Sequence, residues 1–194
     1  MSRSARPSAC NLADLIVYLS RLGQASARCA ETAPQSLTAA QWTALRYFAR
    51  ANRFSRTPSA FSEFHATTRG TASQTVKSLV VLGLLRRQSH ESDARSTVIE
   101  ITEAGREMLR HDPLEDLRKA LERLAPERRD ALADALGQTI VTLAEDRKAP
   151  VFGSCSECNH CHQDDGSYFC LSTRSFLSLP EMQAICVDFE PSAR

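Results

Sequence analysis

The sequence has no long hydrophobic run, only seven glycines in 194 residues, and a net charge of +1. No apolar stretch approaches the roughly 20 residues that span a bilayer. Residues 2–9 are polar, so the start of the chain does not resemble a signal peptide, and we expect a soluble, cytoplasmic protein that does not bind membranes. The chain also lacks a glycine-rich phosphate loop, a His-x-Glu deaminase string and a serine–histidine arrangement at recognisable spacing. We therefore do not expect an enzyme.

The small net charge conceals an uneven distribution along the chain. Residues 1–110 contain 15 Lys or Arg and 8 Asp or Glu, whereas residues 111–194 contain 9 and 15. The first part would attract phosphates and the second part would repel them. A nucleic-acid-binding surface is therefore expected in the first part, although solvated charge without a purpose would give the same counts.

Two helices are predicted in the first 51 residues. Apolar residues recur at three- and four-residue spacing over residues 11–28. A second helix should run over residues 39–51, because Thr38 can cap its start while Gln41 reaches back to the capping residue.

The next segment has the pattern of a helix-turn-helix followed by a wing. Thr57-Pro58 opens a short helix, and Thr68 caps another that ends at Gly83. Two strands then follow, at residues 84–87 and 97–101, joined by a polar loop over residues 88–96.

Leucines repeat through the helical segments that come next. Thr102 caps a helix that ends near Asp112-Pro113, and the apolar stripe continues through residues 114–143. Such a stripe is usually part of a core, and here the core could be shared between two chains.

The order and spacing of these pieces resemble the multiple-antibiotic-resistance regulator (MarR) family of winged-helix repressors over residues 11–143. The resemblance rests on residues 37–42, 68–85, 93–95 and 101–106. It implies a mainly α fold with a small β wing, in which the N- and C-terminal helices of an obligate homodimer interleave. It further implies binding to pseudo-palindromic operators in double-stranded DNA, with recognition helices roughly 34 Å apart.

The residues expected to contact DNA are polar and avoid the apolar stripe of the second helix-turn-helix helix. Gln74 suits adenine edges, Arg69 suits guanine or a phosphate, and the wing arginine Arg95 matches the arginine with which the family enters the minor groove. The full expected set is Arg69, Thr71, Ser73, Gln74, Lys77, Arg87, Asp93 and Arg95. Simple solvation of an exposed face is the alternative for Gln74 and Lys77.

The C-terminal segment, residues 150–194, contains five of the seven cysteines, and we treat it as a module separate from residues 1–149. The expected metal ligands are Cys155, Cys158, Cys170 and Cys186, with Cys161 as a possible extra ligand. In a reducing compartment, clustered thiols more often bind metal than form disulfides. His160 and His162 are possible alternate ligands, although exposed loop histidines are the simpler interpretation.

Two metal centres fit this pattern. A structural Zn²⁺ site usually has two close cysteine pairs, whereas Cys170 and Cys186 are widely separated. The Cys-x-x-Cys-x-His start and the final Cys186 before Pro191 are similar to small high-potential-type 4Fe–4S modules of some enzymes. We therefore prefer a 4Fe–4S cluster and keep Zn²⁺ as the alternative.

These features together predict a dimeric, sequence-specific transcriptional regulator, most simply a repressor, whose operator binding responds to an iron–sulfur cluster that senses iron or redox state. One rival is a MarR-type repressor with a purely structural zinc, released by a small organic acid or phenol. A rival of another class is a cytosolic iron–sulfur electron-transfer protein, in which the helices serve only as a scaffold.

Overall fold

The computed structural model describes residues 9–29, 37–90 and 93–192. The larger elements run, in chain order, as α1 (Ala9–Cys29), α2 (Ala39–Arg50), α3 (Pro58–Phe64), α4 (Arg69–Val81), β1 (Leu85–His90), β2 (Asp93–Ile101), α5 (Glu103–Leu109), α6 (Glu115–Glu122) and α7 (Pro126–Arg147). They are followed by β3 (Gly153–Ser154), η1 (Cys155–Glu157), β4 (Cys161–Asp164), β5 (Ser167–Cys170), β6 (Ser175–Leu177), η2 (Leu179–Gln183) and β7 (Ile185–Cys186). None of the described helices is long and apolar enough to cross a membrane.

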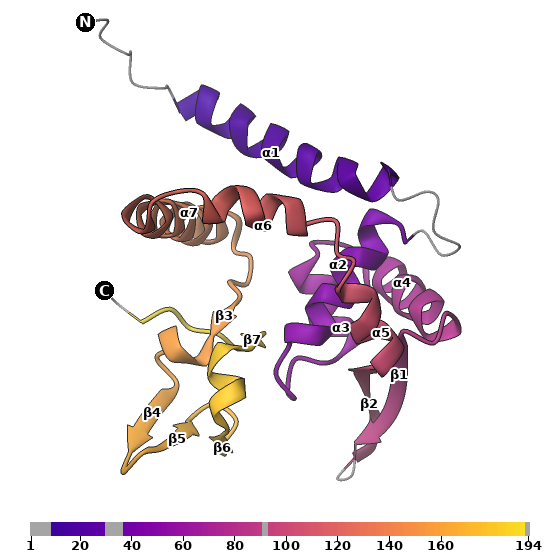
Figure 1. The fold of residues 1–194 in the computed structure, drawn as a ribbon. Coiled ribbons are helices and arrows are strands. Elements are labelled where there is room, and N and C mark those ends of the chain that lie inside the picture. The colour runs from indigo at the N-terminus through magenta and orange to yellow at the C-terminus, as the bar shows by residue number, and fades with distance from the viewer. Residues whose placement is uncertain (1–8, 30–36, 91–92, 193–194) are drawn as a thin grey trace, which may run out of the picture.

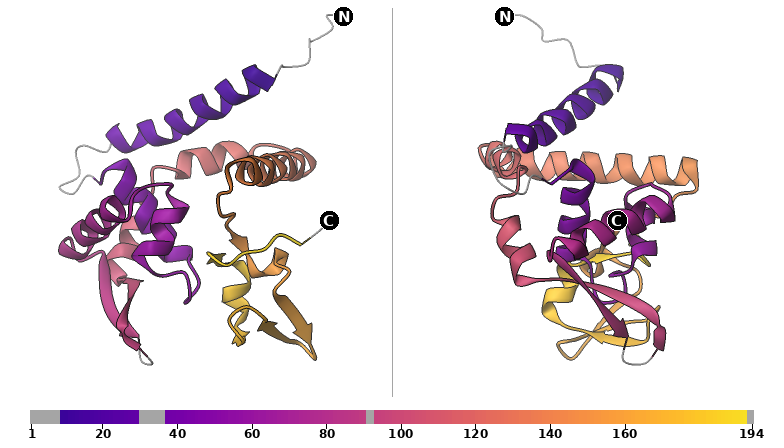
Figure 2. Two further views of the ribbon diagram at one scale, coloured as in Figure 1. Left: turned by 180° about the vertical axis from the view of Figure 1, so that it is seen from behind. Right: turned by 90° about the vertical axis from the view of Figure 1, so that its right-hand side faces the viewer.

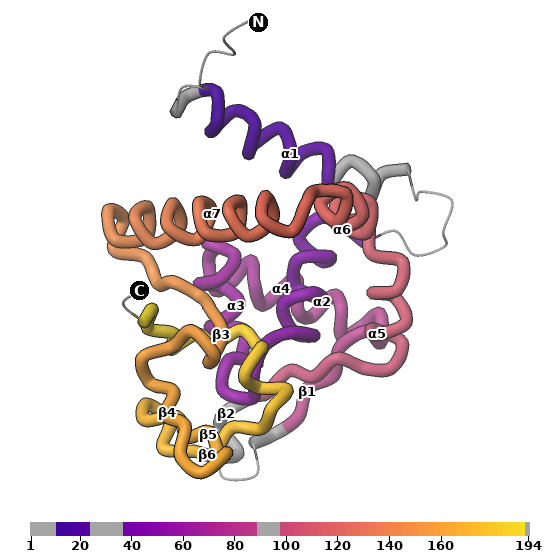
Figure 3. Tube along the Cα trace, turned by 60° about the vertical axis from the view of Figure 1, so that its left-hand side comes forward, coloured from indigo at the N-terminus to yellow at the C-terminus, as the bar shows by residue number. Residues whose placement is uncertain are grey.

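The molecule has three parts. The first consists of α1, α6 and α7, which lie at one end of the molecule (Figure 1). The second, which we call the lobe, comprises residues 37–109, and the third, the cysteine module, comprises residues 153–192. Figure 2 shows the lobe and the module side by side, with the wing and the β4–β6 hairpins both pointing away from α1. In Figure 3, α7 runs across the top of the lobe and the module.

The predicted helix starts are confirmed. At α2 the Thr38 hydroxyl accepts a hydrogen bond from the Gln41 amide, and the Gln41 side chain accepts one from the Thr38 amide. At α4 the Thr68 hydroxyl accepts a hydrogen bond from the Thr71 amide, without the reciprocal bond. The helix region then ends at Gly83, whose φ of +72° is one that L side chains rarely adopt.

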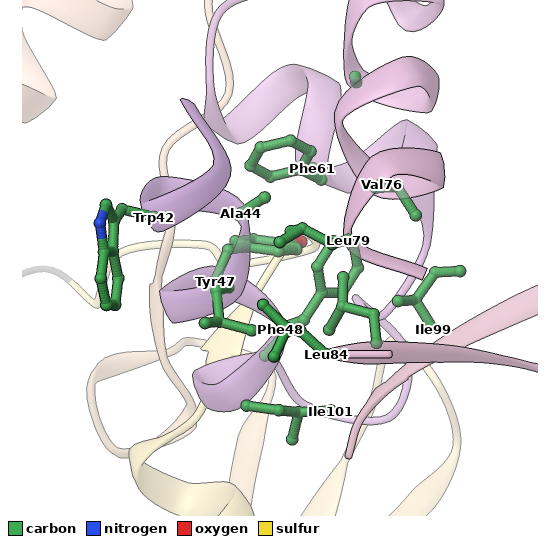
Figure 4. Packing of buried hydrophobic residues seen from close by; sticks show 14 of the residues in the cluster. Trp42, Ala44, Tyr47, Phe48, Phe61, Val76, Leu79, Leu84, Ile99 and Ile101 are labelled. Carbon is green, nitrogen blue, oxygen red and sulfur yellow. The ribbon is translucent and has the colours of Figure 1, made fainter. Parts of the chain in front are cut away.

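A single apolar core holds the lobe together. Tyr47 and Phe48 of α2 pack against Phe61 of α3, Leu79 of α4 and Ile99 of β2, and all five are at most 1% exposed (Figure 4). Burying a side chain of this size stabilises the fold by about 1.5–3 kcal/mol. The core therefore fixes α4 and the wing relative to α2.

The wing is longer than the sequence predicted. β1 and β2 pair antiparallel from Leu85 opposite Ile101 to Ser89 opposite Thr97. The polar segment 88–96, expected as a loop, is therefore largely strand, because backbone pairing continues regardless of side-chain polarity once the apolar residues have set the register. The prediction of a loop over residues 88–96 was wrong for most of that range.

Several large apolar side chains of α1 and α7 are exposed in the single chain. On α1, the exposed fractions of Leu12, Leu15, Ile16, Leu19 and Leu22 lie between 43% and 58%. On α7, the exposed side chains are Leu132, Leu136, Ile140 and Leu143. Contiguous exposed apolar surface of this kind marks an interaction site. The leucine stripe is therefore only partly core within one chain.

Candidate nucleic-acid interface and thiol centre

Helix α4 has one buried face and one polar face. Ala72, Val76 and Leu79 are fully buried against the lobe core. The five α4 residues expected to contact DNA are all exposed, namely Arg69, Thr71, Ser73, Gln74 and Lys77. The helix thus presents hydrogen-bond donors and acceptors to solvent in the manner of a recognition helix.

Thr71 is partly committed to the start of the helix. Its hydroxyl lies 2.9 Å from the Thr68 hydroxyl, and its amide donates to the same Thr68 oxygen. Because the hydroxyl already has a partner, Thr71 has less capacity to contact a base than Ser73 or Gln74.

A side-chain contact that the sequence did not predict fixes the orientation of α4. The side-chain amide of Gln41 donates from Nε2 to the Ser78 hydroxyl at 3.0 Å, and that hydroxyl donates to the Thr75 carbonyl. Gln41 therefore closes the capping box of α2 and also ties α2 to α4. Sequence spacing gives no signal for such a long-range contact.

The base of the wing carries two neighbouring arginines, and both are exposed. Arg86 forms an ion pair with Glu100 on the opposite strand at 2.6 Å. The expected contact of Arg87 with DNA stays a prediction. Asp93 and Arg95 lie on β2, but their side chains fall outside the described residues, so their expected roles stay predictions.

The fold brings the five clustered cysteines into one region. Cys155 and Cys158 lie at η1, Cys161 on β4 faces Cys170 on β5 across the antiparallel pair, and Cys186 lies on β7. Cys155, Cys170 and Cys186 are buried and the other two are half-buried. The Glu190 backbone amide donates to the Cys158 sulfur at 3.5 Å.

Contacts between the thiols make their acidities unequal. A hydrogen bond from Cys155 lowers the pKa of Cys186 to about 6, with further support from Asn52 and a backbone amide. The same hydrogen bond, together with burial, raises the pKa of Cys155. Burial and the nearby Cys158 and Cys170 also raise the pKa of Cys161. The Cys186 sulfur is therefore the one most readily ionised of these three.

The thiols are close together but not arranged as a finished ligand set. Among the described residues, no group of three or more Cys, His, Asp or Glu side chains is placed to hold an ion as it stands. Cys161 instead donates to the Met182 sulfur at 3.8 Å, and His160 pairs with Glu190 at 3.1 Å. The four expected ligands and Cys161 share one region, but their metal-binding role stays a prediction.

The cysteine module contacts the lobe at the connection between α2 and α3. No sequence motif predicted this contact. The Asn52 amide donates to the Ile185 carbonyl at 2.9 Å, and the Val187 amide donates to the Ser55 hydroxyl at 2.8 Å. Arg53 adds an ion pair to Glu181 at 2.9 Å. We call these contacts the seam.

A cavity of about 550 Å³ lies between the lobe and helices α1, α6 and α7. Its wall is mostly apolar, with Trp42 and Tyr47 from α2 and Leu117 from α6. Arg50 provides positive charge, whereas the Arg46 guanidinium in the same wall is paired with Asp112. A largely apolar pocket with a few polar groups is typical of small-molecule sites.

Comparison with known proteins is informative for the lobe. Residues 35–96 match the model of the MarR family. The matched stretch covers α2, α3, α4 and most of the wing, so the lobe is similar to the winged-helix domain of that family. No curated protein matches the chain.

Several solved structures share the fold. The transcriptional regulator SlyA is 23% identical, with a TM-score of 0.54, over 70% of this chain and 96% of that one. A MarR/EmrR family regulator from Acinetobacter sp. ADP1 is 19% identical, with a TM-score of 0.57, over 69% and 95%. The S. aureus MepR–DNA complex is 18% identical, with a TM-score of 0.56, over 70% and 96%. The similarity in fold thus extends beyond residues 35–96, because each of these structures covers 69% or 70% of this chain.

Proposed function

We propose that this protein is a sequence-specific, DNA-binding transcriptional regulator of the MarR type that acts as a homodimeric repressor. The observation that carries the proposal is the exposed polar face of α4 beside a two-stranded wing, on a core that fixes both. The similar fold of MepR, solved as a complex with DNA, supports it. In this proposal α4 enters the major groove and the wing approaches the minor groove.

Dimerisation is supported by the exposed apolar side chains of α1 and α7. Burying these side chains against a second copy removes them from water and places two α4 helices on one duplex.

DNA binding is tested by selecting operators from random duplexes with the purified chain and then titrating the selected site. We expect Arg69→Ala to weaken binding and to lower the slope of log affinity against log salt by about 1, because one phosphate contact is lost. The control is Arg128→Ala, which removes an exposed arginine from α7. Failure to select any DNA would contradict the proposal and favour the electron-transfer alternative.

We further propose that Cys155, Cys158, Cys170 and Cys186 hold a 4Fe–4S cluster that senses iron or redox state, with Cys161 as the spare thiol. The proposal is supported by five thiols in one region of a module whose apolar core is small. A bound cluster would supply redox-active iron and sulfide, while the chain supplies thiolates and the docking contacts of the seam. The effect on operator binding can be no larger than the difference in DNA affinity between the two states.

The cluster is tested by isolating the protein without oxygen and measuring iron, sulfide and zinc together with the visible absorption. We expect about four irons per chain and a brown protein, with loss of colour in air changing operator affinity. A colourless protein with one zinc per chain would overturn the cluster and leave a structural Zn²⁺ site.

A second candidate is release from the operator by a small aromatic acid. The 550 Å³ cavity favours it, because Trp42 and Tyr47 offer ring contacts while Arg50 suits a carboxylate. Calorimetric titration with salicylate-like acids, followed by operator release, tests this candidate. If such acids bind and release DNA while air exposure does not, the ligand-responsive function replaces the cluster-responsive one.

A further inference from the structure

The lobe contains a buried polar side chain beside the thiol centre, and one of its polar atoms has no partner among the described residues. Asn52 is 1% exposed and lies in the connection between α2 and α3. Its Oδ1 atom accepts hydrogen bonds from the amides of Phe54 at 3.1 Å and Ser55 at 2.9 Å. These two bonds fix the orientation of the side-chain amide, so that Nδ2 is the atom left to point elsewhere.

The Nδ2 atom of Asn52 has no hydrogen-bond partner among the described residues. A buried amide N–H without a partner costs about 1–3 kcal/mol, so it calls for an explanation. Cys186, which is also buried, directly follows Ile185, whose carbonyl accepts from the backbone amide of Asn52 at 2.9 Å. A buried thiol of the centre is thus held next to the residue that carries the unpartnered Nδ2 atom.

The backbone on both sides of Cys186 holds it against Asn52. The Ile185 carbonyl accepts from the backbone amide of Asn52, and the Val187 backbone amide donates to the Ser55 hydroxyl. Residues 51 and 185 also form a parallel β-bridge. Cys186 is therefore held from both sides by the lobe.

We propose that Asn52 is a positioning residue of the thiolate centre, which donates a hydrogen bond from Nδ2 to the Cys186 sulfur when that sulfur ligates a metal. The inference rests on the metal centre proposed above. It makes the centre a joint site, with four ligands from the module and one outer hydrogen bond from the DNA-reading lobe. Groups that hydrogen-bond a metal ligand orient it and tune the metal.

This arrangement gives the centre a direct route to the DNA-reading surface. The connection that contains Asn52 continues to Arg56, whose carbonyl accepts from the Ile99 amide of β2 at 2.8 Å. Oxidation or loss of the Cys186 ligand removes the acceptor of the Asn52 hydrogen bond. The seam then loosens at the segment that supports the wing.

The test uses the full-length chain loaded with Co²⁺ alone as the probe, because thiolate-to-cobalt absorption reports the electron density on sulfur whatever the native metal is. A hydrogen bond stabilises the sulfur lone pair, so removing it moves the absorption to longer wavelength. We expect this shift in both Asn52→Ala and Asn52→Asp. The matched control pair, Gln183→Ala and Gln183→Glu, changes an exposed amide of the same module and should leave the band unmoved.

The outcomes separate this inference from the function on which it rests. If the folded Asn52 variants bind Co²⁺ and the band does not shift, the inference alone is overturned. A shift in Asn52→Asp without a shift in Asn52→Ala also overturns it, because such a shift reports the added charge and not the loss of a hydrogen bond. A chain that binds no Co²⁺ overturns the metal centre and the inference together.

A second measurement needs no variant, in case the Asn52 variants fail to fold. Hydrogen exchange of the unaltered chain is compared with and without Zn²⁺. We expect Zn²⁺ to slow exchange across residues 51–56 more than across residues 69–81. Zn²⁺ bound without any slowing at residues 51–56 overturns the inference.

Discussion

Arg46 of α2 binds both carboxylate oxygens of Asp112, the residue at which the chain leaves α5 and turns toward α6. Its Nε and Nη2 atoms lie between 2.6 and 3.1 Å from those oxygens, and the Asp112 side chain is only 1% exposed. Arg118 of α6 adds a second ion pair to Asp112 at 2.9 Å. One carboxylate therefore joins the lobe to the helices that are expected to dimerise.

Replacing Asp112 should destabilise the protein. In Asp112→Asn the amide can still accept from the Leu114 amide, but the charge-assisted hydrogen bonds of Arg46 and Arg118 are weakened. We expect the free energy of unfolding in urea to fall by about 2 kcal/mol. Asp164→Asn, at an exposed position of β4, is the control and should change it by less than about 0.5 kcal/mol. Equal stability of the two variants would contradict the structural role of Asp112.

The same carboxylate should make stability depend on acidity. Burial disfavours its ionisation, but hydrogen bonds and charge from Arg46 outweigh burial, so the pKa of Asp112 is lowered below its ordinary value. A lowered pKa in the folded state gives stability that is complete above the pKa of the unfolded state, about 4. This stability is lost as the pH falls through the pKa of the folded state. Urea unfolding of the original chain should therefore weaken between about pH 5 and pH 2 by more than that of Asp112→Asn. Parallel pH profiles would refute this assignment.

Gln74 should contribute to sequence discrimination as well as to affinity. A side-chain amide that pairs with an adenine edge contributes roughly 1–3 kcal/mol of discrimination. Titration of Gln74→Ala with the selected operator should show a loss of about 5- to 150-fold, and substitution of the contacted base should then no longer matter. Gln163→Ala, an exposed amide on β4, serves as control. If Gln74→Ala binds the operator as the original chain does, α4 reads DNA through other residues.

The exposed apolar side chains of α1 and α7 should hold the dimer. Leu15→Glu and Ile140→Glu each place a charge in a surface that would otherwise be buried, so light scattering should detect monomers at concentrations where the original chain is dimeric. Val81→Glu changes a side chain that is 78% exposed at the end of α4, and it should leave the dimer intact. A dimer that survives both interface variants would place the contact on another surface.

Local sequence determined the helix starts and ends of the lobe. Thr38 with Gln41, Thr68, and Gly83 act within three or four residues of the backbone that they cap or terminate, so their effects are readable from spacing alone. Burial of Ala72, Val76 and Leu79 followed from helical periodicity, and it left the polar face of α4 exposed as predicted.

The tertiary structure alone decided how the cysteine module meets the lobe. Asn52 and Ile185 are joined by a backbone hydrogen bond, and Arg53 and Glu181 by an ion pair, although each pair is separated by more than 120 residues. Local periodicity and spacing carry no information on such pairs, because their approach depends on where α7 directs the chain and on the surfaces left uncovered after the lobe has folded. The sequence thus determined that a helix with a polar, basic face and a set of thiols exist, and packing decided that the thiol-bearing module meets the lobe at the α2–α3 connection.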